Sequence, residues 1–205
     1  MVFMLLGPPP TRALYLCVLS RLAKICSDLN LVEALTHAAS PAQFIQLLAA
    51  AEEPLGDITA PEGMPRFSVL GAGPGGMAMA AHLTLTGCQV NLFTRNPERL
   101  APIVARGGIV VTGELEGFVS LNLVTTDIAE AIQNTDIIMV VVPATAHQNI
   151  ARLIAPHIRD GQILVLNPGR TGGALEVAQI LQAINPKVRP YIAEAQSLLY
   201  AARLT

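Results

Sequence analysis

The strongest chemical signal in the 205-residue sequence is the glycine-rich run Gly71-Ala72-Gly73-Pro74-Gly75-Gly76. It follows a short apolar run and precedes a predicted helix, which is the setting in which a GxGxxG motif binds a dinucleotide. Gly71 permits a tight turn out of the strand, Gly73 lets the backbone approach a pyrophosphate, and Gly76 lets the helix pack closely on the strand. The helix N-terminus then holds the phosphate charge. We therefore take all six residues as candidate cofactor-binding residues; a glycine turn without a ligand is the alternative.

The residues after the next predicted strand bear on which dinucleotide is bound. That strand, Gln89 to Phe93, is followed by Thr94-Arg95-Asn96, and no acidic residue comes before Glu98. An Asp or Glu here would bond the 2′-hydroxyl of NAD, whereas Arg95 can pair with a 2′-phosphate, to which Thr94 or Asn96 can donate. The sequence favours NADP and leaves NAD possible. The alternative interpretation of Arg95 is a solvated surface charge.

Two later loops are expected at the same crevice, because the carboxyl ends of parallel strands share one edge of a sheet. Pro143 and Ala144 follow an apolar run, and their small size leaves room for a nicotinamide riboside near the backbone. Asn167-Pro168-Gly169-Arg170-Thr171-Gly172-Gly173 follows another such run and is rich in donors. It is suited to hold a carboxylate or carboxamide through backbone N–H groups, Asn167 and Arg170.

The remaining polar residues give weaker signals. We interpret His147 as a polar residue at a helix N-terminus, and Glu194 and Arg203 as solvated helix charges, with ligand contact as the alternative for each. No two His residues share metal-ligand spacing, and Cys17, Cys26 and Cys88 have neither metal nor redox spacing. The sequence predicts no metal site, and it assigns no catalytic residue.

The elements that must position these loops alternate between strand and helix. Short β-branched runs without polar alternation are typical of strands buried on both faces of a parallel sheet. They occupy 67–70, 89–93, 136–142 and 162–166, and predicted helices lie at 75–86, 97–106, 145–157 and 172–184. The order predicts an α/β fold of Rossmann type, with a doubly wound, mainly parallel sheet. Residues 108–122 predict an inserted hairpin.

The first third of the chain has a different pattern. Leu14, Val18, Leu22 and Ile25 recur at helical spacing, and Ser40-Pro41 is typical of a helix start. Residues 54–65 contain three prolines and two glycines, which is linker composition. We therefore expect a helical N-terminal extension over 1–53, a linker over 54–66 and the cofactor domain over 67–205.

Composition limits the class of protein. Apolar residues make up 52% and charged residues 14%, which excludes disorder of the whole chain. A net charge of −2 and 4% aromatic residues argue against a nucleic-acid-binding protein. No run reaches the roughly 18 apolar residues that a membrane span needs. We expect a cytoplasmic protein with reduced thiols and no membrane association.

At the level of whole segments the sequence resembles a known family. The run from Val69 to Gly76, Val142-Pro143-Ala144, the NPGRTGGALE segment (167–176) and the EAQSLLYAAR segment (194–203) look like the NAD(P)-binding domain of the octopine/nopaline (opine) dehydrogenase family, in the 6-phosphogluconate-dehydrogenase-like Rossmann superfamily. The domain also resembles those of ketopantoate reductases and glycerol-3-phosphate dehydrogenases. The resemblance implies an oxidoreductase that condenses an amino acid with a 2-oxo acid, with hydride passing from the nicotinamide to an imine carbon.

The resemblance also implies what residues 67–205 lack. Members of the family continue into a helical domain that supplies the His and carboxylate for proton handling, and no positions here match those groups. We expect a cofactor-binding half without its helical substrate domain, which a separate chain could carry. The alternatives are a non-catalytic dinucleotide-binding regulatory domain and a truncated, inactive gene product. A further alternative is that residues 1–63 are upstream sequence translated from an early start codon. Their helical pattern argues against this alternative.

Overall fold

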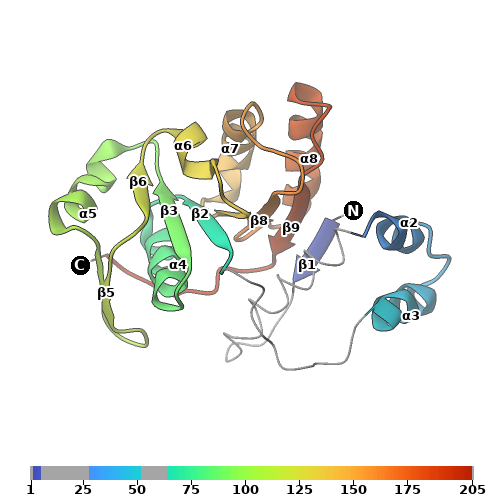
Figure 1. Ribbon diagram of the computed structural model, residues 1–205, viewed down its shortest axis with the longest axis horizontal. Helices are drawn as coiled ribbons and strands as arrows, with labels where there is room; N and C mark the ends of the chain where they lie inside the picture. Colours follow the sequence, from blue (N-terminus) through green and yellow to red (C-terminus); the bar gives the residue numbers. More distant parts are fainter. Residues whose placement is uncertain (1, 6–27, 52–63, 205) are drawn as a thin grey trace. The chain divides into compact units, whose positions relative to one another are not determined.

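The computed structural model describes residues 2–5, 28–51 and 64–204 (Figure 1). The described residues fall into two compact units. One contains residues 28–51, and the other combines residues 2–5 with residues 64–204.

The larger unit is built on a seven-stranded sheet in which every neighbouring pair of strands is parallel. The strand order is β1-β9-β8-β7-β2-β3-β6. The strands are β1 (Val2–Leu5), β2 (Arg66–Leu70), β3 (Gln89–Phe93), β6 (Leu123–Thr125), β7 (Ile137–Val140), β8 (Ile163–Leu166) and β9 (Tyr191–Ala195). This is the doubly wound, mainly parallel sheet that the sequence predicts.

Helices cover both faces of this sheet (Figure 1). They are α4 (Pro74–Leu85), α5 (Ala101–Arg106), α6 (Ile128–Ile132), α7 (His147–Ile154) and α8 (Gly173–Ile184), with short 3₁₀ turns η1 (Pro97–Arg99) and η2 (Ala144–Ala146). Leu70, Ile138 and Val140 share a buried cluster with residues of α6, α7 and α8. The alternate residues of these strands point to the opposite face, where α4 packs against β2 and β3. Because both faces are covered, β7 and β8 are apolar at every position, and β2 and β3 are buried at every position after their first residue.

The predicted hairpin is confirmed, as β4 (Ile109–Val111) and β5 (Gly117–Val119) pair antiparallel. The sequence does not predict α6, β6 or β9. Strand β6 and helix α6 are too short, at three and five residues, to give a periodic pattern. Strand β9 reads Tyr-Ile-Ala-Glu-Ala, in which the acidic residue masks the apolar pattern.

The smaller unit contains α2 (Leu29–Thr36) and α3 (Pro41–Ala51). The Asp28 carboxylate caps α2 by accepting from the N–H groups of Asn30 and Leu31, at 3.0 and 3.1 Å. The predicted helix start at Ser40-Pro41 is confirmed, because the Ser40 hydroxyl accepts from the Gln43 N–H at 3.2 Å.

Other predictions for this part of the chain have mixed outcomes. The helical pattern of Leu14 to Ile25 and residues 54–63 of the linker lie outside the described residues. Within the predicted helical extension, residues 2–5 form a strand instead, and β1 pairs with β9 in the register Val2↔Ile192. No helix among the described residues has the length and apolar character needed to cross a bilayer.

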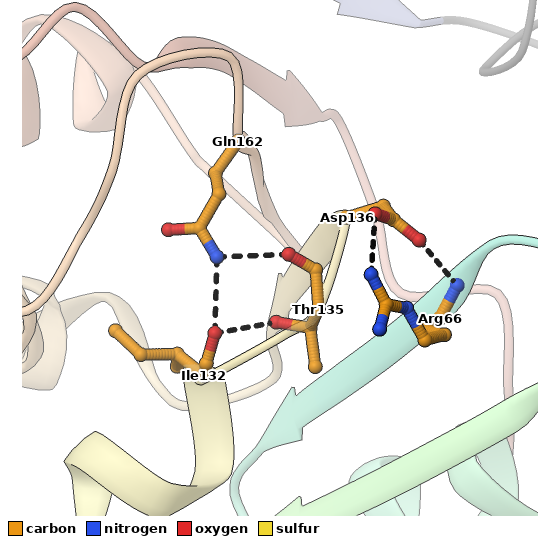
Figure 2. A network of polar contacts seen from close by, with 5 residues as sticks. All are labelled: Arg66, Ile132, Thr135, Asp136 and Gln162. Atoms are coloured by element: carbon orange, nitrogen blue, oxygen red, sulfur yellow. Dashed lines mark hydrogen bonds and ion pairs between the residues drawn. The ribbon is translucent and has the colours of Figure 1, made fainter.

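Polar side chains connect the amino-terminal ends of three neighbouring strands (Figure 2). The buried Gln162 side chain, just before β8, donates to the carbonyls of Ile132 and Thr135 at 3.0 and 2.9 Å and accepts from the Arg159 N–H at 2.8 Å. Asp136, just before β7, accepts from the N–H of Arg66 at 2.8 Å and lies 3.5 Å from its guanidinium. We call Arg66, Thr135, Asp136 and Gln162 the amino-edge network.

Candidate functional site

The glycine run forms the turn between β2 and α4 that the sequence predicts. Gly71 has φ +125° and donates its N–H to the Phe93 carbonyl at 2.8 Å, and a Cβ there would overlap the Val141 carbonyl. A Cβ at Gly76 would overlap the Gly71 carbonyl, so only glycine allows α4 to approach β2 this closely. Gly73 is the N-cap of α4 and has no side chain to bond the first-turn N–H groups. The first turn of the helix is therefore suited to bind an anion.

A cation that the sequence analysis missed lies beside this turn. The Arg99 guanidinium, at the end of η1, donates to the Ala72 carbonyl at 3.4 Å, and a Cβ at Gly73 would lie 3.6 Å from its Nη1 atom. Arg99 is exposed, so its remaining N–H groups face solvent beside the glycine run. In the sequence, Arg99 is marked only by its spacing of four residues from Arg95. Its contact with Ala72 joins residues 27 apart and depends on how η1 folds back, so the local sequence does not predict it.

Thr94, Arg95 and Asn96 follow β3 at the same edge of the sheet, as predicted. The Thr94 hydroxyl accepts from the Asn96 N–H at 3.3 Å, and the Asn96 side chain caps η1 by accepting from the Glu98 N–H at 2.9 Å. Arg95 is exposed. Thr94 and Asn96 therefore hold the turn that presents the Arg95 side chain to solvent.

Pro143 and Ala144 follow β7, next to the glycine run. The Val141 N–H donates to the Leu70 carbonyl at 2.9 Å, so the ends of β7 and β2 lie side by side. Pro143 is exposed and precedes η2. The two small residues thus occupy the same edge as the glycine run.

The loop after β8 begins with a buried Asn167. Its backbone N–H donates to the Val140 carbonyl at 2.8 Å, and its side-chain N–H donates to the Val165 carbonyl at 3.0 Å. This side chain is 1% exposed and holds the start of the loop. Arg170 is exposed, with φ +60°, and is the residue that this loop presents.

Glu194 corrects an interpretation made from the sequence. It lies on β9 and is 9% exposed, whereas we interpreted it as a solvated helix charge. Its Oε2 atom accepts from the Ala174 N–H, in the first turn of α8, at 2.8 Å. A Cβ at Gly169 would overlap the Glu194 side chain. The carboxylate therefore connects the start of α8 to β9, and the loop after β8 lies close against the same side chain at Gly169.

His147 begins α7, as predicted, but it is only 1% exposed. A Cβ at Gly173 would lie 3.2 Å from His147 Nδ1 and 3.5 Å from Glu194 Oε2, so only a glycine fits between the two side chains without crowding. Burial lowers the pKa of His147, although the charges of Glu176 and Glu194 and a hydrogen bond with the Val142 backbone act to raise it. Nε2 of this ring has no hydrogen-bond partner among the described residues. His147 is thus a buried residue that does not face solvent at the site.

Within residues 2–5, 28–51 and 64–204, no three His, Cys, Asp or Glu side chains gather in a way that could hold a metal ion. Cys88 is a buried free thiol. Arg203 is exposed near the end of the described residues but lies outside any helix, whereas we interpreted it as a solvated helix charge.

The carboxyl edge of the sheet thus combines a glycine turn, three exposed arginines (Arg95, Arg99 and Arg170) and the loops after β7 and β8. Residues 67–194 match the family model described as ketopantoate reductase PanE/ApbA. The chain belongs to this family. The resemblance of the domain to ketopantoate reductases is thereby confirmed.

Curated relatives extend the resemblance to two other groups of dehydrogenases. An opine dehydrogenase from Arthrobacter sp. (strain 1C) is 42% identical over 138 residues, which is 67% of this chain and 38% of the relative. A glycerol-3-phosphate dehydrogenase from Lactobacillus delbrueckii subsp. bulgaricus is 34% identical over 108 residues, or 50% of this chain and 30% of the relative. Both resemblances predicted from the sequence are confirmed. The chain spans less than two-fifths of the length of these relatives.

Solved structures agree with the Rossmann-type fold. Octopine dehydrogenase in complex with NADH and agmatine has a TM-score of 0.52 and 23% identity, over 58% of this chain and 32% of that chain. Yersinopine dehydrogenase with NADP⁺ bound has a TM-score of 0.50 and 22% identity, over 62% of this chain and 34% of that chain. At these identities the likeness shows the fold, which confirms the fold class predicted from the sequence.

Proposed function

We propose that this chain binds a nicotinamide dinucleotide, with a preference for NADP(H), as the cofactor domain of an oxidoreductase of the opine dehydrogenase type. The observation that carries the proposal is the 42% identity with an opine dehydrogenase over 138 residues. The glycine run supports it independently, because Gly71 and Gly76 make close backbone approaches that a Cβ would prevent.

The residues present fit a dinucleotide. The first-turn N–H groups of α4, around Gly73, Pro74, Gly75 and Gly76, would bind the pyrophosphate, with Gly71 and Ala72 forming the turn before them. Arg99 would add positive charge beside the same phosphates, because its guanidinium already contacts the Ala72 carbonyl. Pro143 and Ala144 would leave space for the nicotinamide riboside, and Asn167 would hold the loop beside it.

The preference for the phosphorylated cofactor rests on the turn after β3. Arg95 is exposed there, and no carboxylate lies within Thr94–Asn96 to bond a ribose 2′-hydroxyl. A guanidinium pairs bidentately with a phosphate, which favours NADP(H). The two similar structures carry NADH in one case and NADP⁺ in the other, so the preference depends on this chain's own residues.

The bound reduced nicotinamide would supply hydride to the imine carbon formed from an amino acid and a 2-oxo acid. The exposed Arg170 would bind a substrate carboxylate, since it projects from the loop that Asn167 and Glu194 hold in place. The described residues of the larger unit offer no exposed His near this loop to handle the imine proton. We propose that a helical domain outside residues 67–205 supplies that group, on a separate chain or otherwise, and that the protein acts in the cytoplasm.

Titration of the full chain with NADPH and with NADH tests the cofactor proposal. We expect a lower Kd for NADPH. The Arg95→Asp variant should raise the Kd for NADPH about 10- to 100-fold, because it removes a charge-assisted interaction worth about 1.5–3 kcal/mol. Arg106→Asp, an equal charge change at an exposed site on α5, should leave it unchanged. An unchanged ratio of the two Kd values in Arg95→Asp would show that Arg95 is only a surface charge.

The reaction is tested by adding amino acid and 2-oxo acid mixtures to the chain with NADPH, alone and with candidate chains that carry a helical domain. Oxidation of NADPH that depends on both substrates supports the oxidoreductase. Tight binding without oxidation in every mixture would contradict it and favour a regulatory dinucleotide-binding domain.

A further inference from the structure

The chain after β9 returns to the glycine run. Strand β9 is separated from β2 by β8 and β7, yet residues 196–204 reach α4, the helix that follows β2 (Figure 1). We call residues 196–204 the return segment. Two contacts attach it: Leu198 packs against Gly75, and Tyr200 contacts His82. The segment therefore lies along the helix that opens with the glycine motif.

The contact of Tyr200 with His82 fixes the segment in a defined position. The Tyr200 hydroxyl lies 2.8 Å from His82 Nδ1, and the two rings meet edge to face with centroids 5.8 Å apart. Gly75 and His82 are seven residues apart, which places them on one face of α4 two turns from each other. The two contacts thus attach the segment to one side of the helix.

Gly75 is the glycine of this run that dinucleotide binding does not explain. The motif requires Gly71, Gly73 and Gly76, and Gly75 is absent from the glycines with positive φ. A Cβ at Gly75 would overlap the Cδ2 atom of Leu198 and lie 3.4 Å from its Cγ. The space that Gly75 leaves open is therefore the space that the Leu198 side chain occupies.

We propose that Leu198 is a positioning residue for the cofactor: by packing on Gly75 it fixes the first turn of α4 and keeps water from that side of its N–H groups. Hydrogen bonds from these N–H groups to an anion are stronger where water is excluded. Tyr200 acts through Leu198, because its contact with His82 holds the segment in place. The inference rests on the proposed binding of a dinucleotide.

A double-mutant cycle between Gly75 and Leu198 tests the inference. The atom that a Cβ at Gly75 would meet is the end of a flexible side chain, so Gly75→Ala should displace Leu198 and leave the helix intact. We expect Gly75→Ala to raise the Kd for NADPH about tenfold and Leu198→Ala about fivefold, within the range of coupling between contacting residues. In the Leu198→Ala background, Gly75→Ala should change the Kd less than about twofold, because the side chain that it displaces is gone.

Two further variants separate positioning from general stability. Leu199→Ala is the matched control, because Leu199 is the neighbouring residue and is 52% exposed; it should change the Kd less than about twofold. Tyr200→Phe keeps the ring but removes the hydroxyl that meets His82, and should raise the Kd about threefold in the wild type and not in Leu198→Ala. Melting temperatures without cofactor are measured for every variant, since a merely structural role would lower these and leave no coupling in the Kd values.

The outcomes are distinct. An equal effect of Gly75→Ala with and without Leu198 overturns the inference and leaves dinucleotide binding intact. Failure of the wild-type chain to bind NADPH or NADH overturns both proposals. If Gly75→Ala does not fold, the inference is decided by Leu198→Ala and Tyr200→Phe, and Kd values within twofold of that of Leu199→Ala overturn it.

Discussion

At the amino-terminal edge of the sheet, side chains bond the backbone of neighbouring segments, whereas at the glycine turn of the carboxyl edge no side chain caps the first turn of α4. Gln162 uses both ends of its amide on the Ile132, Thr135 and Arg159 backbone, and Asp136 accepts from the N–H of Arg66. Across the same strands, Gly71, Gly73 and Gly76 have no side chains that could compete for the first-turn N–H groups of α4.

The difference shows how one sheet can stabilise the fold at one edge and bind a ligand at the other. Buried polar groups that are paired contribute to stability, and groups left unpaired at the other edge are available to a ligand. The comparison predicts that changes at the amino edge lower stability and leave the Kd for the dinucleotide unchanged. Changes at the carboxyl edge should raise the Kd for the dinucleotide, with or without a loss of stability.

The largest effect is expected for Gly76→Ala. Its Cβ would overlap the Gly71 carbonyl, which is backbone, so α4 has to move away from β2. We expect the Kd for NADPH to rise at least about 100-fold, the scale of loss for a displacement of about 1 Å, and the free energy of unfolding to fall by about 1–3 kcal/mol. Binding titration and urea denaturation measure the two quantities.

Gly161→Ala is the control at the other edge. Gly161 has φ +77° and open space around it, so the variant should cost only the conformational strain of about 1–2 kcal/mol and leave the Kd unchanged. A Kd of Gly76→Ala within threefold of the wild-type value would contradict the role of the close approach.

Gln162→Ala is expected to lower the free energy of unfolding by about 2–4 kcal/mol without changing the Kd. It leaves the buried Thr135 carbonyl and the Arg159 N–H without this partner, at about 1–3 kcal/mol for each unpaired group. Gln182→Ala, at an exposed position of α8, should cost less than about 0.5 kcal/mol. Denaturation curves compare the variants, and equal losses in both would show that the amino-edge network contributes nothing.

A smaller effect on the free energy of unfolding is expected when the pH is lowered. Because burial lowers the pKa of His147 in the folded state, the unfolded state binds the proton more readily. The free energy of unfolding should therefore fall as the pH drops below about 6.5, the ordinary pKa of His, and level off below the folded pKa. His147→Gln should flatten this part of the curve, and His157→Gln, at an exposed position, should not. Curves of wild type and His147→Gln that run parallel below pH 6.5 would show that another group is responsible.

The smallest effect is expected for Arg66→Met, at no more than about 0.5 kcal/mol. The guanidinium of Arg66 and the Asp136 carboxylate are about half exposed, at 47% and 50%, and such pairs contribute little. Asp136→Ala should cost more, about 1 kcal/mol, because the Arg66 N–H loses its acceptor. A larger loss in Arg66→Met than in Asp136→Ala would mean that the ion pair is the important contact.

The sequence predicts those parts of the molecule that depend on local pattern. The continuous apolar runs of β2, β3, β7 and β8 and the glycine turn are visible along the chain, because burial on both faces and positive φ each leave a residue-type signal. The sequence does not show which contact requires each glycine. Gly75 looks like part of the dinucleotide motif, yet the space that it leaves is filled by the Leu198 side chain.

What the sequence does not predict depends on packing between distant segments. Arg99 and Glu194 are positioned by contacts with residues 20 or more positions away, and His147 lies on α7, which packs against α8. Local sequence predicts that a charged or polar residue in a short segment is exposed, because the segment that buries it is far along the chain. Glu194 was interpreted as solvated for this reason.

The pairing of β1 with β9 bears on any form of the protein that begins at Met64. In such a form β9 would keep its pairing with β8 but lose β1, and the N–H and C=O groups on the β1 side of Tyr191–Ala195 would become an open template for another strand. Glu194, whose carboxylate bonds the first turn of α8, lies on this same strand. Residues 2–5 thus occupy the position beside β9 that another strand could otherwise take.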